Sequence, residues 1–318
     1  MRIMVTGGLG VNGAWVVREF VQRGHDVAIV ENRDDRALIA DVADRVEVVL
    51  VDICDVDELT AVTRRIAPDI VVHLAAFVDC ERHPLTALAV NVDGTAHVCE
   101  AAVAAGVERL VYTSTKGVYA PATGEYGHPT YRPVAEDDLA GPVVMYGITK
   151  AAGEDVVGWY GRTTDLTTVS LRFGTIFGPG RLQRHAGAIN TYSSMIELPA
   201  SGEPFSLEHG GDQRDDLVYV VDAADAIVTV ALAPELGHQV YNVAAGHTVS
   251  IREYADAIRR VLPDAELHIG SGLDPMDQAD PYYMALDASR IADDLGWKPS
   301  YDIDRAVRHY VDLIEPVA

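Results

Sequence analysis

The chain has 318 residues, 48% hydrophobic and 23% charged, and this composition excludes collagen-like, disordered and small disulfide-stapled proteins. Acidic residues outnumber lysine and arginine by 48 to 25, and the net charge of −23 argues against a nucleic-acid-binding surface. No apolar run approaches the roughly 18 residues of a membrane helix, and no signal peptide precedes the first apolar run. Cys54, Cys80 and Cys99 lack metal-ligand spacing and predict free thiols in a reducing compartment. We therefore expect a soluble, cytoplasmic protein without a metal, nucleic-acid or membrane partner.

The first half of the chain alternates short apolar runs with segments of helical length. The runs have the uninterrupted Val, Ile and Leu character of strands that are buried on both faces of a parallel sheet. The alternation predicts βαβ units and an α/β fold, a Rossmann-type doubly wound parallel sheet. Strands are predicted at Arg2–Thr6, His25–Val30, Val46–Val51, Ile70–His73, Leu110–Thr113 and Thr168–Arg172, and helices at Gly13–Arg23, Val56–Ile66, Pro84–Ala105 and Tyr146–Tyr160.

The pattern loosens after about residue 175, where Gly- and Pro-rich stretches surround short helices and strands. We expect residues 1–174 to form a dinucleotide-binding domain and residues 175–318 to form mainly a smaller substrate-binding lobe. Strands at Val218–Val221 and Val240–Val243, within the stretch 213–245, are expected to return to the main sheet, and a helix closes the chain after Tyr301. The two parts are therefore expected to be interleaved.

A glycine-rich segment, TGGLGVNG at residues 6–13, lies between the first strand and the first helix. Gly7 permits a tight turn, Gly10 lets the backbone approach a pyrophosphate, and Gly13 lets the helix pack on the sheet. The helix N-terminus then offers amide groups and a positive dipole end to the anion. This context predicts a dinucleotide site, and the alternative is a purely structural strand–helix turn.

Glu31 ends the second strand, 21 residues after Gly10. A carboxylate there accepts hydrogen bonds from the adenosine ribose hydroxyls and repels a 2′-phosphate, which favours NAD over NADP. Arg33 and Arg36 are the counter-argument, since a guanidinium could hold that phosphate. Asp52 follows the third strand and is placed either to reach the adenine edge or to act as a strand-end cap.

Tyr146 and Lys150 are four residues apart on a predicted helix and therefore share one helix face. The ammonium and a nicotinamide ring would stabilise the phenolate and lower the pKa of Tyr146 towards neutrality. Tyr146 could then take the proton from a substrate hydroxyl while hydride leaves the same carbon. A hydroxyl from the strand that ends in Tyr112–Thr115 could lie beside it.

Together these segments resemble the extended short-chain dehydrogenase/reductase superfamily, and within it the NAD-dependent epimerase/dehydratase family. The resemblance extends over nearly the whole chain and is specific for the family rather than for a substrate. The matching segments, in family order, are TGGLGVNG (6–13), VDI (51–53), HLAA (73–76), NVDGT (91–95), YTSTKGVY (112–119), YGITK (146–150), LRFGTIFGP (171–179), QRDDLVYVVD (213–222) and LGWKP (295–299).

The resemblance implies a role for individual residues. Tyr146 would be the catalytic base, Lys150 its electrostatic partner and a ribose ligand, and Thr115 the hydroxyl that binds the reacting group. Besides Gly7, Gly10, Gly13, Glu31, Asp52, Tyr146 and Lys150, the implied cofactor contacts are Leu9, Val11, Asn12, Asn32, Arg33, Ile53, Leu74, Ala75, Ala76, Asn91 and Phe173. The implied substrate contacts are Ser114, Lys116, Thr175 and Arg214. Asn91 could instead be only a helix cap, and Ser114 only a strand-end hydroxyl.

The chain departs from the family pattern at several substrate positions. Lys116 and Gly117 replace the Asp–Glu pair of dehydratases, which disfavours dehydration, and decarboxylation likewise. Thr175 replaces an Asn of nucleotide-sugar enzymes, and Asp274 replaces one of two arginines that bind the diphosphate, while Arg214 matches the other. Lys116 either attracts an anionic substrate group or simply reaches solvent or a neighbouring carboxylate, and we favour the second interpretation.

The function predicted from the family is an NAD-dependent sugar oxidoreductase, with a nucleotide-sugar 4-epimerase as the leading hypothesis. The alternative is an NAD-dependent dehydrogenase of a non-nucleotide polyol, sugar acid or other secondary alcohol. A non-catalytic dinucleotide sensor is least favoured, because such proteins usually lose the Tyr–Lys pair that this chain keeps. The family also implies a homodimer through the two long helices at 84–105 and 146–160.

Overall fold

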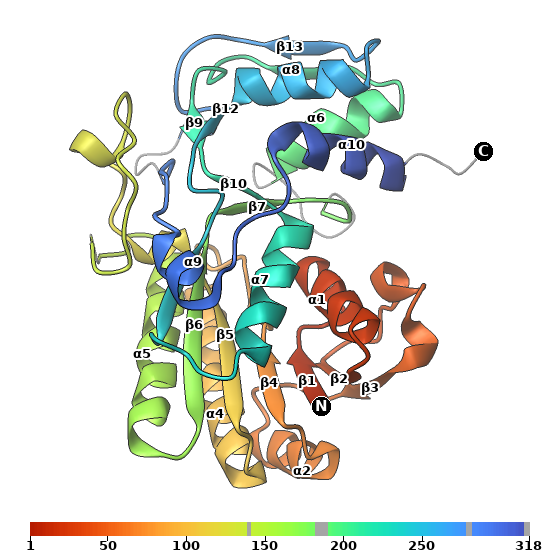
Figure 1. Cartoon of the computed structure of the whole chain (residues 1–318), viewed down its shortest axis with the longest axis vertical. Coiled ribbons are helices and arrows are strands. Elements are labelled where there is room, and N and C mark those ends of the chain that lie inside the picture. Colours follow the sequence, from red (N-terminus) through yellow and green to blue (C-terminus); the bar gives the residue numbers. More distant parts are fainter. Residues whose placement is uncertain (139–140, 182–189, 278–281, 315–318) are drawn as a thin grey trace.

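The computed structural model describes residues 1–138, 141–181, 190–277 and 282–314 (Figure 1). Seven strands form one central sheet with every neighbouring pair parallel, in the order β11-β6-β5-β4-β1-β2-β3. The order reverses between β1 and β4, so the doubly wound sheet predicted from the sequence is confirmed. Its strands are β1 (Arg2–Thr6), β2 (Asp26–Glu31), β3 (Val46–Leu50), β4 (Ile70–His73), β5 (Arg109–Thr115), β6 (Thr167–Phe173) and β11 (Val240–Val243).

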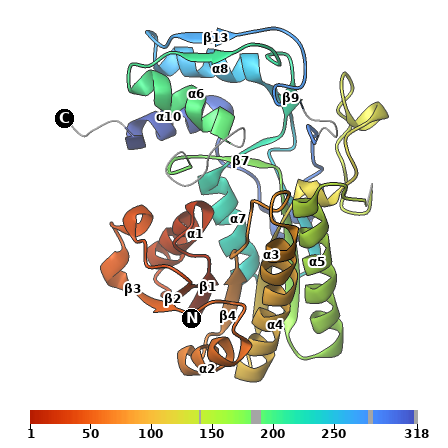
Figure 2. The ribbon, with the colours of Figure 1, turned by 180° about the vertical axis from the view of Figure 1, so that it is seen from behind.

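Helices cover both faces of this sheet. Helices α1 (Val11–Gln22) and α7 (Val220–Leu232) pack together on one face (Figure 1). On the other face lie α2 (Val56–Ile66), α4 (Gly94–Ala105) and α5 (Met145–Thr163) (Figure 2). Alternate strand residues enter separate cores: Ile3 and Val5 join one cluster and Met4 joins the other. This double burial explains why the strands are apolar without interruption.

The long helix predicted at 84–105 is divided into three segments. A short α3 (Pro84–Leu88) leads into a π-helical turn at Ala89–Asp93, and α4 follows it. A π-bulge inserts one residue into the helical turn and often marks a functional site. Here the bulge holds the buried side chain of Asn91.

The second lobe has its own apolar cluster, which includes Phe177, Met195, Tyr254 and Tyr310. Of the two strands expected to return, Val240–Val243 does join the main sheet, as β11. The other differs: β10 pairs with β7 outside the main sheet, because the chain after β6 leaves the sheet layer before α7 re-enters it. The remaining elements are β7 (Thr175–Phe177), α6 (Thr191–Ala200), β8 (Phe205–Leu207), β9 (Arg214–Asp215), β10 (Leu217–Tyr219), β12 (Val249–Ser250), α8 (Ile251–Val261), β13 (Leu267–Ile269), α9 (Ser289–Leu295) and α10 (Ile303–Ile314), besides short 3₁₀ turns at Ala37–Ile39, Ala43–Arg45, Lys116–Val118 and Gly124–Tyr126.

The packing is interleaved, as the sequence predicts: α7 and β11 lie after residue 174 and belong to the sheet layer. In the part of the chain that the structure describes, no helix is both long and apolar enough to cross a membrane.

Candidate active site

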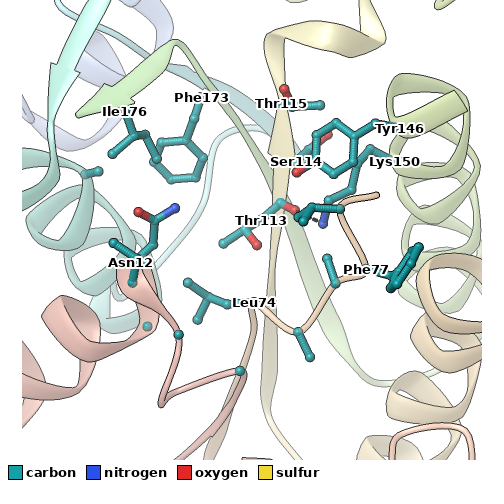
Figure 3. Close-up of a pocket in the computed structure, with 18 of the residues that line it drawn as sticks. Asn12, Leu74, Phe77, Thr113, Ser114, Thr115, Tyr146, Lys150, Phe173 and Ile176 are labelled. Carbon is teal, nitrogen blue, oxygen red and sulfur yellow. Dashed lines mark hydrogen bonds between the residues drawn. The ribbon is translucent and has the colours of Figure 1, made fainter. Parts of the chain in front are cut away.

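A cavity of about 1010 Å³ opens at the carboxyl ends of the sheet strands and continues to the second lobe. Its position at the reversal of strand order is where doubly wound sheets bind ligands. Figure 3 shows Tyr146 and Lys150 projecting from α5 towards Thr113, Ser114 and Thr115 of β5, with Asn12 across the cavity. Of the predicted site residues, all line this cavity except Asn91 and Arg214.

The glycine loop is built for close approach. A Cβ atom on Gly13 would lie 2.1 Å from the carbonyl oxygen of Gly7, so only glycine lets α1 begin this close to β1. The N-cap residue of α1 is Gly10, so no side chain caps the first N–H groups of the helix. No acidic residue lies in the first turn either. The first amide groups of α1 thus remain available to an anion. The loop fits the pyrophosphate of a dinucleotide.

Glu31 lies beside this loop, and its Oε1 accepts a hydrogen bond from the backbone N–H of Leu9 at 3.2 Å. Arg33 lines the cavity, whereas Arg36 is absent from the lining and donates to Asp34. Asp52 is the strand-end cap, since its Oδ1 accepts from the N–H of Cys54 at 2.9 Å, and it also lines the cavity, while its contact with adenine stays a prediction. The carboxylate of Glu31 therefore lies in the cavity wall next to the glycine loop.

Arg181, which the sequence analysis did not single out, also lines the cavity. Its side chain is nearly buried, at 9% exposed, and donates to Oδ1 of Asn12 at 3.1 Å. Among the described residues, its Nε atom has no hydrogen-bond partner and no carboxylate pairs with the guanidinium. A buried cation without a counter-charge is costly. Together with the helix N-terminus beside Asn12, this guanidinium fits an anionic ligand group.

Tyr146 and Lys150 reach the cavity because α5 packs tightly on the chain after β5. A Cβ atom on Gly147 would lie 2.1 Å from the carbonyl oxygen of Gly117, so glycine lets the helix approach the turn that follows Thr115. Lys150 Nζ donates to the carbonyl oxygen of Thr113 at 2.7 Å and lies 4.6 Å from the ring centroid of Tyr112. The helix thus fixes both side chains against β5.

The pKa values of the pair move in directions set by burial. Burial raises the pKa of Tyr146 to about 12, and the nearby Cys80 adds to the rise while Arg181 opposes it. Burial lowers the pKa of Lys150 to about 8, against an opposing effect of Glu154. The lowered tyrosine pKa was predicted for a site that holds a nicotinamide ring, and it stays a prediction. In the protein alone desolvation of the phenol dominates, and Lys150 directs its ammonium to a backbone carbonyl. Tyr146 holds its proton firmly before ligands bind.

Two hydroxyl groups of β5 line the cavity next to Tyr146. Thr115 Oγ1 accepts from the N–H of Gly117 at 3.1 Å, and within the described residues this acceptor role is its one bond, leaving the hydroxyl hydrogen for a ligand. Ser114 Oγ is buried and makes no hydrogen bond to any described residue. The unsatisfied, buried hydroxyl group of Ser114 and the free hydroxyl hydrogen of Thr115 at the cavity wall indicate a polar ligand.

Asn91 lies behind the cavity wall instead of in it. Its Oδ1 accepts from the N–H of Phe77 at 2.7 Å, and its Nδ2 donates to the carbonyl of Phe77 and to Thr149 Oγ1. It therefore ties the lining segment after β4 to α5, and the interpretation of Asn91 as a simple helix cap is not supported either.

At the substrate end, Lys116 forms an ion pair with Asp215, a second residue that the sequence analysis missed. This pairing agrees with the favoured interpretation that Lys116 reaches a neighbouring carboxylate. Thr175 Oγ1 donates to the other carboxylate oxygen of Asp215 at 2.6 Å. Arg214 points elsewhere, to Thr248 and Glu253, and does not line the cavity.

The sequence did carry weak signals for the missed residues. Arg181 ends a GPGR turn after β7, and Asp215 is adjacent to the arginine that the family pattern singled out. Tyr192, Tyr282, Tyr283 and Phe77 lie in segments without a recognisable motif. Lining residues beyond the prediction include Phe77, Glu81, Arg181, Tyr192, Asp215, Met276, Tyr282 and Tyr283.

The chain is similar to known proteins over nearly its whole length. The model of the NAD dependent epimerase/dehydratase family matches residues 3–244. A UDP-glucose 4-epimerase of Mycolicibacterium smegmatis is 31% identical over 98% of both chains. The crystal structure of the UDP-glucose 4-epimerase of Thermus thermophilus in complex with NAD superposes with a TM-score of 0.82, at 27% identity over 98% of both chains. MoeE5 in complex with UDP-glucuronic acid and NAD gives a TM-score of 0.81 at 25% identity, over 98% of both chains.

Proposed function

Since this chain belongs to the NAD-dependent epimerase/dehydratase family, we propose that it is an NAD-dependent nucleotide-sugar oxidoreductase of the 4-epimerase type. One observation carries the proposal: Tyr146, Lys150 and Thr115 converge at one end of the cavity. Glu31 lies at the opposite end, which is the proposed adenosine side. The relatives at 31% and 27% identity are UDP-glucose 4-epimerases, which supports a nucleotide hexose as substrate.

NAD, when bound, supplies the hydride acceptor for the carbinol carbon of the substrate. Thr115 donates its hydroxyl hydrogen to the reacting oxygen and orients it towards Tyr146. In its phenolate form Tyr146 takes the hydroxyl proton during oxidation and becomes the neutral phenol, and it returns the proton during reduction, so the phenolate is restored in each cycle. Lys150, protonated below about pH 8, stabilises this phenolate before the proton is taken. Epimerisation additionally requires the keto form of the sugar to turn before it is reduced.

A second candidate is a net dehydrogenase of a non-nucleotide polyol, sugar acid or other secondary alcohol. The observation that favours it is at the substrate end: Arg214 lies outside the cavity wall, and the carboxylate of Asp215 takes a place in it. A carboxylate next to a diphosphate weakens binding. A weakly held ketone leaves before it is reduced.

The two candidates differ in the fate of the hydride. Incubation of the enzyme with NAD and a panel of UDP-sugars, free polyols and sugar acids should yield an epimer of a nucleotide hexose without accumulation of NADH. Tyr146→Phe is the matched control, because it removes the transferable proton and leaves the remaining cavity wall in place. NADH that accumulates with a free polyol or sugar acid, with no epimer from any nucleotide sugar, would establish the second candidate.

We further propose a homodimer in the cytoplasm. Exposed apolar side chains on α3 and α5, namely Leu85, Leu88, Ile148 and Trp159, support a partner surface there. The thiols of Cys54, Cys80 and Cys99 support a reducing compartment. Sedimentation of the purified chain tests the dimer, and Trp159→Glu should shift it to the monomer.

A further inference from the structure

Lys116 is a buried lysine in the wall of the substrate end, and the catalytic roles above do not use it. It begins the 3₁₀ turn Lys116–Val118, directly after Thr115, and is 9% exposed. Among the described residues its ammonium has one hydrogen-bond partner, Asp215. An ammonium has three N–H groups, so two remain for a ligand in the cavity that Lys116 lines.

Asp215 is held in place by donors on both of its oxygens. The N–H of Asp216 donates to Oδ1 at 3.0 Å, and Thr175 donates to Oδ2 at 2.6 Å. Asp215 is 2% exposed, and its carboxylate faces the ammonium of Lys116 as an ion pair. Lys116 is therefore a fixed donor and not a mobile surface chain.

Two further hydroxyl groups belong to the wall of the same cavity. Ser114 Oγ and the hydroxyl of Tyr192 are buried, line the cavity and bond to none of the described residues. Burial and the nearby charge of Asp215 raise the pKa of Tyr192, so this phenol stays a donor. Each unsatisfied group costs free energy unless a ligand or water binds it. The wall is thus rich in donors and suits a ligand with several oxygen atoms.

We propose that Lys116, fixed by Asp215, is a specificity-determining residue that donates to a neutral hydroxyl on the carbon next to the reacting carbinol, and so selects a vicinal diol. The inference rests on the proposed function, because Thr115 and Tyr146 hold the reacting hydroxyl and Lys116 follows Thr115 in the chain.

The charge of the pair explains why the selected group is neutral. A carboxylate or phosphate at this place would be attracted by Lys116 but repelled by Asp215, and would lose its hydration without a net counter-charge. A hydroxyl accepts from the ammonium and can donate to the carboxylate, so it satisfies both partners. The site therefore discriminates against a substrate with an anionic group on this carbon and also against a deoxy substrate, which carries only hydrogen there.

The test compares UDP-glucose with its 3-deoxy analogue, and free glucose with 3-deoxyglucose, on the NAD-loaded enzyme. Lys116→Met should lower kcat/KM for the diol about 10- to 100-fold, mainly through KM, since one hydrogen bond to a charged group is lost. It should leave the deoxy analogue unchanged. Because Lys116→Met leaves Asp215 unpaired and can impair folding, the double variant Lys116→Met/Asp215→Asn is made in parallel and should show the same loss of discrimination.

A binding measurement separates this inference from the proposed function. Calorimetric titration of the NAD-loaded Tyr146→Phe enzyme with each pair of sugars should show tighter binding of the diol, and the double variant should abolish the difference. If the wild-type enzyme turns over no sugar but this discrimination is found, the proposed function fails and the inference stands. Equal affinity for diol and deoxy sugars, or turnover discrimination that survives both variants, would overturn the inference.

Discussion

Replacement of Arg181 by methionine should weaken the binding of NAD, and it should leave the Tm of the NAD-free protein unchanged or raise it. The guanidinium is buried beside Asn12 at the N-terminus of α1, with Nε unpartnered and no carboxylate among the described residues to balance it. Burial lowers its pKa, which reflects the cost of holding the charge there. We expect the pyrophosphate of NAD, on the amide groups of α1, to supply the missing negative charge.

The magnitude follows from one hydrogen bond between charged groups. Such a bond contributes about 1.5–3 kcal/mol, so Arg181→Met should raise the Kd for NAD about 10- to 150-fold. Methionine keeps the apolar contacts of the arginine stem. Removing an uncompensated buried cation should leave the Tm of the NAD-free protein unchanged or raise it. The variant thus gains or keeps intrinsic stability but loses the thermal shift that NAD produces.

The assay is isothermal titration calorimetry with NAD, combined with thermal melts with and without NAD. Arg23→Met is the control, because Arg23 pairs with Glu19 at 35% side-chain exposure and does not line the cavity. An NAD affinity equal to that of wild type would refute the assignment of Arg181 to the cofactor. If NAD binding is intact but the KM for the sugar substrate rises, the guanidinium serves an anionic group of the substrate instead.

Three further predictions concern single side chains. Tyr146→Phe should abolish turnover and leave NAD affinity nearly intact, and full activity of this variant would rule out Tyr146 as the base. Thr115→Val should lower kcat by about 10²–10³-fold, as for the loss of one polar transition-state contact. Glu31→Ser should raise the affinity for NADP relative to NAD, because the repulsion of the 2′-phosphate is gone and Arg33 in the cavity wall can bind that phosphate. A wild-type protein that already prefers NADP in a titration would contradict this prediction. Burial lowers the pKa of Lys150 from 10.5 to about 8, so the unfolded chain binds more protons between these pH values and folding stability rises with pH there. Lys150→Met should therefore be more stable than wild type at pH 7, with an advantage in urea unfolding that narrows from pH 8 to 10.5; an advantage independent of pH would show that the buried charge is not its cause.

The sequence by itself determined the sheet and the placement of Tyr146 and Lys150 on one helix face. Strands such as Ile70–His73 could be predicted because a parallel sheet buries both faces, so the apolar run has no polar interruptions. Tyr146 and Lys150 were predictable because a spacing of four residues places side chains on one helix face. The glycine loop was predictable since its chemistry is local to one strand–helix turn. In each case the signal lies within a few consecutive residues.

Only the tertiary structure decided what the substrate end looks like. Arg214 and Asp215 are neighbours on a two-residue strand, and because successive strand residues point to opposite sides, the pairing of β9 with β12 decides which of them enters the cavity. Lys116 meets Asp215 across 99 positions in sequence, a contact that no local pattern encodes. The same holds for the pKa of Tyr146 in the protein alone, which is raised because segments distant in the sequence together bury the phenol. Local spacing determines which side chains share a helix or strand face. Burial and charge pairing depend on segments that only the whole fold brings together.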